Sequence, residues 1–323
     1  SPTLGGAGTI YKKADAATNG DLIIDNNFLD ADLDDRFIGK TPLTGTFTFD
    51  TLTVKSRGHM VLNSDSTITY SALDWSSSGT IEDNNAGTFA LVTGGGSLTI
   101  PATSRYYANT VRTYTAGTVT GTITHEGNGS TADRRMNLTF SSLTIEPEGS
   151  INASEKGFFF GEGGGQGADS AQPGGGGYGG FGGSGYSGTL TGTAGGITYG
   201  SITAPTDLGS GGGITSAQGG KGGGAVQVTV SGTLTVNGTI AAGGENMNVV
   251  GGSDAGGGSG GSVYLDVGTL AGTGSVTSNG GNSNGEGGGG GGGRIALLYA
   301  TDSSTLTLSA GGGVNEATAS PNF

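Results

Sequence analysis

The chain has 323 residues, of which 73 are glycine, only 12% are charged and none is cysteine. These proportions exclude a disulfide-stapled domain, and seven prolines without a G-X-Y period exclude collagen. The net charge of −13 speaks against binding of nucleic acid and of anionic lipid, and no stretch reaches the roughly 18–20 apolar residues of a membrane helix.

The glycines are unevenly placed along the chain. Residues 1–156 hold 17 of them and residues 157–323 hold the other 56. Such a composition is typical of disordered linkers, but strand-like segments such as AVQVTV (225–230) and RIALLYA (294–300) lie between the tracts. We therefore expect the glycines to belong to the fold, in three regions: a β-rich region 1–155, a glycine-rich region 156–224 with few strands, and β-helical repeats with glycine tracts over 225–323.

The first candidate for chemistry is the acidic run DNNFLDADLDDR (25–36). Its carboxylates at Asp30, Asp32, Asp34 and Asp35 begin like a calcium loop, but Asp35 stands where an EF-hand needs glycine and Thr41 where it needs glutamate. The run predicts either a simple oxygen-rich calcium site or a solvated acidic loop. No cofactor is required by either reading.

Catalysis has few candidate residues. A β-helical lyase or hydrolase would need carboxylates and basic residues on one face. The residues that could supply some of these are Asp32, Asp34, Asp35 and Arg36. The two histidines, His59 and His125, lie in polar stretches, for which we expect a surface position. We predict that the protein is not an enzyme.

The N-terminal half contains a gapless internal match. DTLTVKSRGHMVL (50–62) aligns with SSLTIEPEGSINA (141–153), and the cores GSLTI (96–100) and GTLTV (232–236) are related to both. The cores begin at Thr51, Ser97, Ser142 and Thr233, at steps of 46, 45 and 91 residues, which indicates one architecture along the chain.

Further along the chain lie candidate surface features. The aromatic residues Tyr178, Phe181 and Tyr186 are read either as an exposed contact patch or as rings that fill space beside side-chain-free tracts. Four sequons, at Asn128, Asn137, Asn152 and Asn237, are acceptors if the source organism glycosylates.

The C-terminal part repeats one template of glycine tract, strand, turn and second short strand. Its first strands are expected to begin near Ala225, Ser262 and Arg294, at steps of 37 and 32 residues, and Leu234, Leu270 and Leu306 to open the second strands. Short, β-branched strands at a recurring spacing predict an all-β solenoid, a right-handed parallel β-helix. A β-sandwich-like N-terminal half is the alternative.

In a solenoid, glycine tracts at equivalent places in successive coils would stack roughly 4.8 Å apart. Extended glycine segments have no internal hydrogen bonds, so their amides must bond between tracts. We predict stacked, polyglycine-II-like layers in which a valine at mid-tract is poorly tolerated.

The segments GGGGGGGRIALLYA (287–300) and GGSGGSVYLDVGTLAGTGSVTSNGGN (257–282) resemble large glycine-rich repeat proteins of bacterial cell surfaces and extracellular filaments. The opening GGAGTIYKKADAATNGDLIIDNN (5–27) also looks like a unit of that family. The resemblance implies an extracellular β-helical structural role and carries over no catalytic residues.

In that family a TLTLSAGGG-type segment (305–313) runs directly into a GGAGTIY-type segment (5–11). This implies head-to-tail contact between identical subunits and hence a filament or surface fibre. The expected contact residues are Gly8, Thr9, Ile10 and Tyr11 at one end and Leu306, Leu308, Val314 and Phe323 at the other. The alternatives are a section of a long surface protein, and an adhesin or carbohydrate-binding segment that contacts surface glycans.

Overall fold

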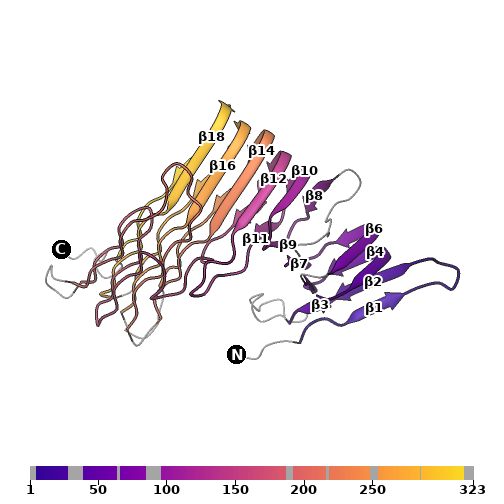
Figure 1. The fold of residues 1–323 in the computed structure, drawn as a ribbon, viewed down its shortest axis with the longest axis horizontal. Helices are drawn as coiled ribbons and strands as arrows, with labels where there is room; N and C mark the ends of the chain where they lie inside the picture. Colours follow the sequence, from indigo (N-terminus) through magenta and orange to yellow (C-terminus); the bar gives the residue numbers. More distant parts are fainter. Residues whose placement is uncertain are drawn as a thin grey trace.

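The computed structural model describes residues 5–27, 39–63, 66–84, 96–186, 192–215, 218–247, 254–283 and 285–315. Within these ranges every regular element is a β-strand, from β1 to β19, and there is no helix, so none that could cross a membrane. The strands stack side by side along one axis, with β1 and β18 at opposite ends of the row (Figure 1).

One continuous sheet of nine short strands runs the length of the row. In spatial order it contains β3 (Thr41–Leu43), β5 (His59–Leu62), β7 (Thr80–Asp83), β9 (Arg105–Ala108), β11 (Thr122–Thr124), β13 (Ser150–Asn152), β15 (Thr239–Ala241), β17 (Ser275–Thr277) and β19 (Thr307–Ser309). All neighbours pair in parallel, in register, with Ile123, Ile151, Ile240, Val276 and Leu308 on one rung.

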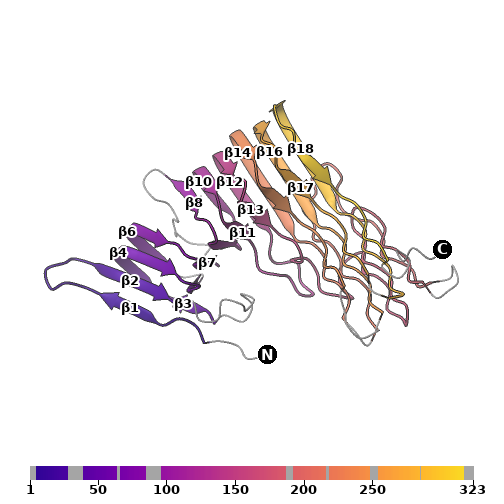
Figure 2. The ribbon, with the colours of Figure 1, turned by 180° about the vertical axis from the view of Figure 1, so that it is seen from behind.

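The opposite layer is divided into two sheets. The first contains β1 (Thr9–Lys12), β2 (Gly20–Asp25), β4 (Thr46–Lys55) and β6 (Thr67–Trp75). The second contains β8 (Ser97–Ile100), β10 (Arg112–Val119), β12 (Met136–Ile145), β14 (Ala225–Val236), β16 (Ser262–Ala271) and β18 (Arg294–Asp302). The break between β6 and β8 is visible from both sides (Figures 1 and 2).

Alternation of apolar and polar residues builds the core between the two layers. In β12 and β14 every second side chain of the first half is buried, and Leu138, Val228, Leu265 and Leu297 form one rung across β12, β14, β16 and β18. Tight turns join long strands to the short strands that follow them, as between β4 and β5 and between β12 and β13. A side chain at Gly149 in such a turn would place Cβ 1.9 Å from the carbonyl oxygen of Val119, and Gly58 occupies the equivalent turn.

From β2 onward, successive strands along the chain alternate between the two layers and pair in parallel within each layer. This arrangement fits a β-solenoid. The predicted strand starts at Ala225, Ser262 and Arg294 are confirmed, because these residues pair directly with one another in β14, β16 and β18. The described N-terminal half is unlike an antiparallel sandwich, since among its strands β1 and β2 alone pair in an antiparallel way.

The expected openings of the second strands are wrong. Leu234 and Leu270 pair with each other but lie inside β14 and β16, and Leu270 pairs with Asp302 rather than with Leu306. The strand β18 therefore extends further than the template predicts, and Leu306 is half-buried beside the outermost rung.

Candidate functional site

The glycine tracts form a bundle on one side of the row of strands, beside the ends of β12, β14, β16 and β18 (Figure 1). No strand is formed by the described residues between Asn152 and Ala225, yet this region is bonded throughout by backbone hydrogen bonds. The tract 174–177 is its centre. Backbone hydrogen bonds join this tract to six other segments, through Gly165, Gly183, Gly196, Gly213, Gly257 and Gly291.

The bundle leaves no room for side chains at its interior glycines. A Cβ added at Gly175 would lie 2.0 Å from the carbonyl oxygen of Gly289, and one at Gly256 would lie 2.1 Å from that of Gly174. A Cβ added at Gly311 or Gly312, on the outermost described tract, would lie 3.7 and 3.6 Å from its nearest neighbour. The predicted lateral bonding between tracts is therefore observed, and the outermost tract has a side that no described residue covers closely.

Tyr178 connects the bundle to the sheets. Its ring is fully buried and lies 4.8 Å from the ring of Tyr199, while its hydroxyl is 2.7 Å from Oγ of Ser262 at the start of β16. The guanidinium of Arg294 lies over the same ring and donates to the carbonyl oxygen of Tyr199. Burial raises the pKa of the Tyr178 hydroxyl, so it remains protonated.

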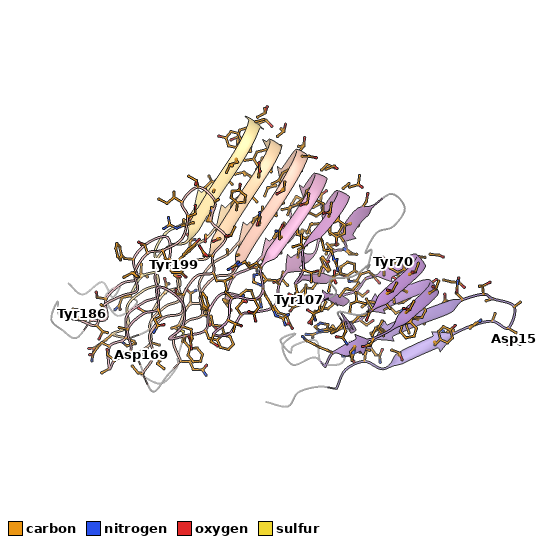
Figure 3. The ribbon with its side chains drawn as sticks, in the orientation of Figure 1. Asp15, Tyr70, Tyr107, Asp169, Tyr186 and Tyr199 are labelled. Atoms are coloured by element: carbon orange, nitrogen blue, oxygen red, sulfur yellow. The ribbon has the colours of Figure 1, made fainter. Side chains whose placement is uncertain are left out.

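Of the predicted aromatic patch, therefore, Tyr178 is an interior packing residue. Phe181 is 71% exposed, and Tyr186 lies on the outside of the bundle (Figure 3). The three rings do not form one exposed surface.

Strand edges with exposed apolar side chains lie at both ends of the row. At the β1 end, Ile10 and Tyr11 are 52% and 55% exposed, and Gly8 and Thr9 are exposed with them. At the opposite end, Leu308 and Val314 are 52% and 53% exposed. Phe323 lies outside the described residues, as do Asp30, Asp32, Asp34 and Asp35.

A chain of charged groups lies on the outer face of the nine-stranded sheet. Glu82 on β7 is 3.1 Å from Nε2 of His59 and 2.6 Å from Nζ of Lys40, and Lys40 also contacts Glu126. Arg134 is the last member of this series of charged groups, and its Nη1 lies 2.6 Å from Oε2 of Glu126. Burial raises the pKa of Glu82, but hydrogen bonds from His59, Lys40 and Asn84 outweigh it and lower that pKa to about 2.

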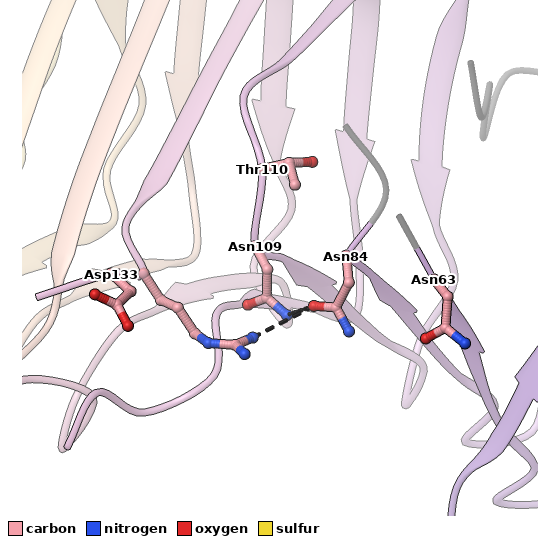
Figure 4. Close-up of a pocket in the computed structure, with 6 residues that line it drawn as sticks. Asn63, Asn84, Asn109, Thr110 and Asp133 are labelled. Carbon is pink, nitrogen blue, oxygen red and sulfur yellow. Dashed lines mark hydrogen bonds between the residues drawn. The ribbon is translucent and has the colours of Figure 1, made fainter. Parts of the chain in front are cut away.

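Beside these charges three asparagines form what we call the amide row: Asn63, Asn84 and Asn109. Each directly follows a strand of the nine-stranded sheet, at the positions after the paired residues Leu62, Asp83 and Ala108. Nδ2 of Asn109 donates to Oδ1 of Asn84 over 2.8 Å, and Arg134 donates to the same oxygen over 3.3 Å (Figure 4). The row lines a solvent-open pocket of about 490 Å³ together with Thr110, Asp133 and Arg134.

A second polar cluster lies inside the core near the break between β6 and β8. The carboxylate of Asp83 is fully buried and accepts two hydrogen bonds from Arg112, at 2.6 and 2.8 Å. The hydroxyl of Tyr106 also donates to Asp83 and lies 3.0 Å from that of Tyr114. Burial raises the pKa of both tyrosines, so they act as neutral donors.

Both histidines are buried, contrary to the expected surface positions. His59 stacks on Tyr107 with ring centroids 5.8 Å apart, and His125 has no exposed surface. Nδ1 of His125 is 2.7 Å from the carbonyl oxygen of Glu126, and Nε2 has no hydrogen-bond partner among the described residues. Burial lowers the pKa of His125 to about 4.

The four sequon asparagines differ in environment. Asn128 is 3% exposed, and its Nδ2 donates to the carbonyl oxygens of Arg134 and Lys156. A glycan on Asn128 would break these bonds, so it does not suit this fold. Asn152 is exposed and Asn137 and Asn237 are half-buried, so glycosylation there stays a prediction.

Within the described ranges there is no group of His, Asp and Glu side chains arranged to hold a metal ion. The polar clusters can bind a ligand through hydrogen bonds or hold coils together. Comparison of the chain with family models, with curated proteins and with solved structures found no match.

Proposed function

We propose that this protein is an extracellular structural protein, a subunit of a filament or surface fibre that assembles head to tail. The observation that carries the proposal is the pair of strand edges with exposed apolar residues at opposite ends of one row of strands. Unpaired edges are templates for pairing with another chain. A contact between two different ends of identical subunits does not close and gives a fibre.

The strand directions are compatible with such a contact. Strand β1 is antiparallel to β2, whereas β18 is parallel to the strands behind it. If subunits stack with the same strand direction, β18 of one chain would meet β1 of the next as an antiparallel pair. The open sides of Gly311 and Gly312 would let the glycine bundle continue across the joint.

We interpret the coils as a right-handed parallel β-helix and the bundle as polyglycine-II-like. Glycine tracts have no side-chain conformational entropy to lose, and many of their amides donate a hydrogen bond to a neighbouring tract. This construction supports a mechanical role better than a catalytic one. Glu82, with its lowered pKa, is ionised at neutral pH and cannot be the raised-pKa acid of a glycosidase.

The position outside the cell and the identical subunits as partners rest on the resemblance of the repeat units to bacterial surface proteins. No cofactor is part of this proposal. A calcium ion at the acidic run 30–35 stays a prediction for residues that the structure does not describe.

Electron microscopy of the purified full chain over a concentration series tests the proposal. We expect filaments with a regular axial repeat at high concentration. The variants Ile10→Lys and Leu308→Lys, one at each end, should shorten or abolish them, because a lysine on an edge opposes strand pairing. Val111→Lys is the matched control, since Val111 is 65% exposed but lies between β9 and β10 in mid-row.

Single particles at every concentration would overturn the proposal. So would filaments that persist in both end variants and are lost in the Val111→Lys control. In either case the apolar ends would need another explanation.

A further inference from the structure

The pocket at the amide row is a feature that the proposed structural role does not use. It is open to solvent, has a volume of about 490 Å³, and lies within the size range of ligand sites. Its lining is polar: three carboxamides, a hydroxyl, a carboxylate and a guanidinium. An apolar ligand would bury these groups without partners, which is unfavourable.

The carboxamides repeat at the spacing of the coils. Because Leu62, Asp83 and Ala108 are paired in register, the asparagines that follow them recur roughly every 4.8 Å along the row. Each carboxamide offers donors and an acceptor side by side. Among the described residues Oδ1 of Asn63 accepts no hydrogen bond, and Nδ2 of Asn109 uses one of its two hydrogens, toward Asn84.

The pocket lining carries one carboxylate, that of Asp133, and one guanidinium, that of Arg134, so the formal charges of the lining are balanced. The guanidinium of Arg134 is paired with Glu126, and the carboxylate of Asp133 lies on the same wall. An anionic ligand would meet Asp133 and an overall charge of −13, and a cation would meet Arg134. The site therefore favours a neutral ligand that both donates and accepts hydrogen bonds.

The pocket is also held in place before any ligand arrives. The amide row stands at the ends of strands in the continuous sheet, and Asn128 fixes the opposite wall through its Oδ1, which accepts from the backbone N–H of Arg134 over 2.7 Å. Side chains fixed in this way lose little freedom on binding, which favours affinity for a weakly binding class of ligand.

We propose that this pocket binds a neutral, hydroxyl-rich saccharide, with the amide row and Arg134 as its hydrogen-bonding groups. Neighbouring hydroxyls of a sugar can each donate and accept, which matches planar carboxamide and guanidinium edges. The site is separate from the strand ends, so saccharide binding and end-to-end assembly are independent properties.

Isothermal titration calorimetry of the full chain tests the site, with cellotetraose, maltotetraose and tetra-N-acetylchitotetraose as neutral probes and tetragalacturonate as the anionic comparator. We expect at least one neutral probe to bind at millimolar concentration. The pocket variants Asn63→Ala and Arg134→Gln should each weaken that binding by roughly three- to tenfold, the effect of one or two lost hydrogen bonds.

Each pocket variant has a matched control. Asn237→Ala makes the same exchange in the turn between β14 and β15, and Arg135→Gln removes the same charge at an exposed neighbour that does not line the pocket. Both controls should bind like the unaltered chain. The proposal fails if no neutral probe binds, if tetragalacturonate binds more tightly than the neutral probes, or if the pocket variants bind as well as their controls.

Discussion

At the scale of single residues, the interior glycines of the bundle are fixed by their neighbours' carbonyl oxygens. The place of a side chain at Gly256 is taken by the carbonyl oxygen of Gly174, and at Gly288 by that of Gly183, each at 2.0–2.1 Å. Both glycines have ordinary backbone angles, so the requirement comes from close approach and not from a left-handed conformation. Even a methyl group must displace a neighbouring tract.

We predict that Gly256→Ala lowers the free energy of unfolding by about 1–3 kcal/mol, the usual effect of inserting a methyl group into a packed interior. Denaturant unfolding followed by circular dichroism measures this. Gly129→Ala is the control, because no atom lies within 4 Å of the added Cβ there. Equal stability of the two variants would contradict the close packing of the bundle.

His125 predicts a dependence of stability on pH. Its pKa is about 4 in the folded chain, because burial opposes the charged ring and Lys156 and Arg134 lie nearby, against an ordinary value of 6.5. The unfolded chain therefore binds more protons between these values, and stability falls as pH drops from 6.5 to 4. We expect a loss of about 3 kcal/mol over this window, measured by unfolding at a series of pH values.

The variant His125→Asn should remove this dependence. Glu82 affects stability in a separate pH range. Its pKa is lowered from 4.5 to about 2, so its contribution to folding stability is fully present above pH 4.5 and is lost as pH falls toward 2. If the free energy of unfolding changes equally between pH 6.5 and 4.5 with and without His125, the pH dependence does not come from His125.

At the scale of elements, the Asp83 cluster holds the coils together where the second layer is interrupted. It joins β7 to β9 and β10, next to the break between β6 and β8. Arg112→Leu leaves the buried carboxylate without its bidentate partner, and we predict a loss of about 3–5 kcal/mol. Adding Asp83→Leu should restore part of it, and a double-mutant cycle measures the coupling.

The glycine tracts behave as regular elements although they are not strands. Their amides donate to neighbouring tracts over 2.7–3.0 Å, as from Gly175 to Gly183 and from Gly183 to Gly289. We predict that the hydrogen-bonded amides of the tracts 174–177 and 288–293 exchange with deuterium as slowly as those of β14, measured by mass spectrometry. Fast exchange there, similar to that of the loop around Gly127, would show that the bundle opens independently of the sheets.

Much of the fold could be predicted from local patterns. The strands from Ala225, Ser262 and Arg294 and the turn glycines Gly58 and Gly149 follow from alternation and internal similarity. The position of Leu306 could not, because the strand pairing places Asp302 rather than Leu306 opposite Leu270, and the internal similarity does not show this shift.

The candidate site was missed for a different reason. Asparagine directly after a strand in three successive coils is a readable signal, at Asn63, Asn84 and Asn109, but it appears only once the coils are aligned. Lys40 and Glu126 are 86 positions apart and meet only through stacking of coils of unequal length. His59 and His125 are buried although their neighbours in the sequence are polar, and for this reason a surface position was expected for both.

At the scale of the whole molecule, net charge acts on the proposed assembly. Subunits that each carry −13 repel one another as their ends approach, and the screening length is about 10 Å at 0.1 M salt. We predict that raising the ionic strength from 10 mM to 500 mM lowers the protein concentration needed for filaments. Light scattering measures this, and filaments that dissolve with added salt would indicate ion pairs at the joint instead.

The bundle changes how the stack would respond to a mechanical load. In a simple stack each coil is bonded only to its two neighbours, so a pull along the axis can detach coils one after another. Here the described residues 157–186 and 192–213 are bonded to three later glycine tracts at once. Gly209 donates to Gly223 before β14, Gly176 donates to Gly257 before β16, and Gly288 before β18 donates to Pro173. The coils of β14, β16 and β18 are thus cross-braced, and we expect them to share the force and yield together.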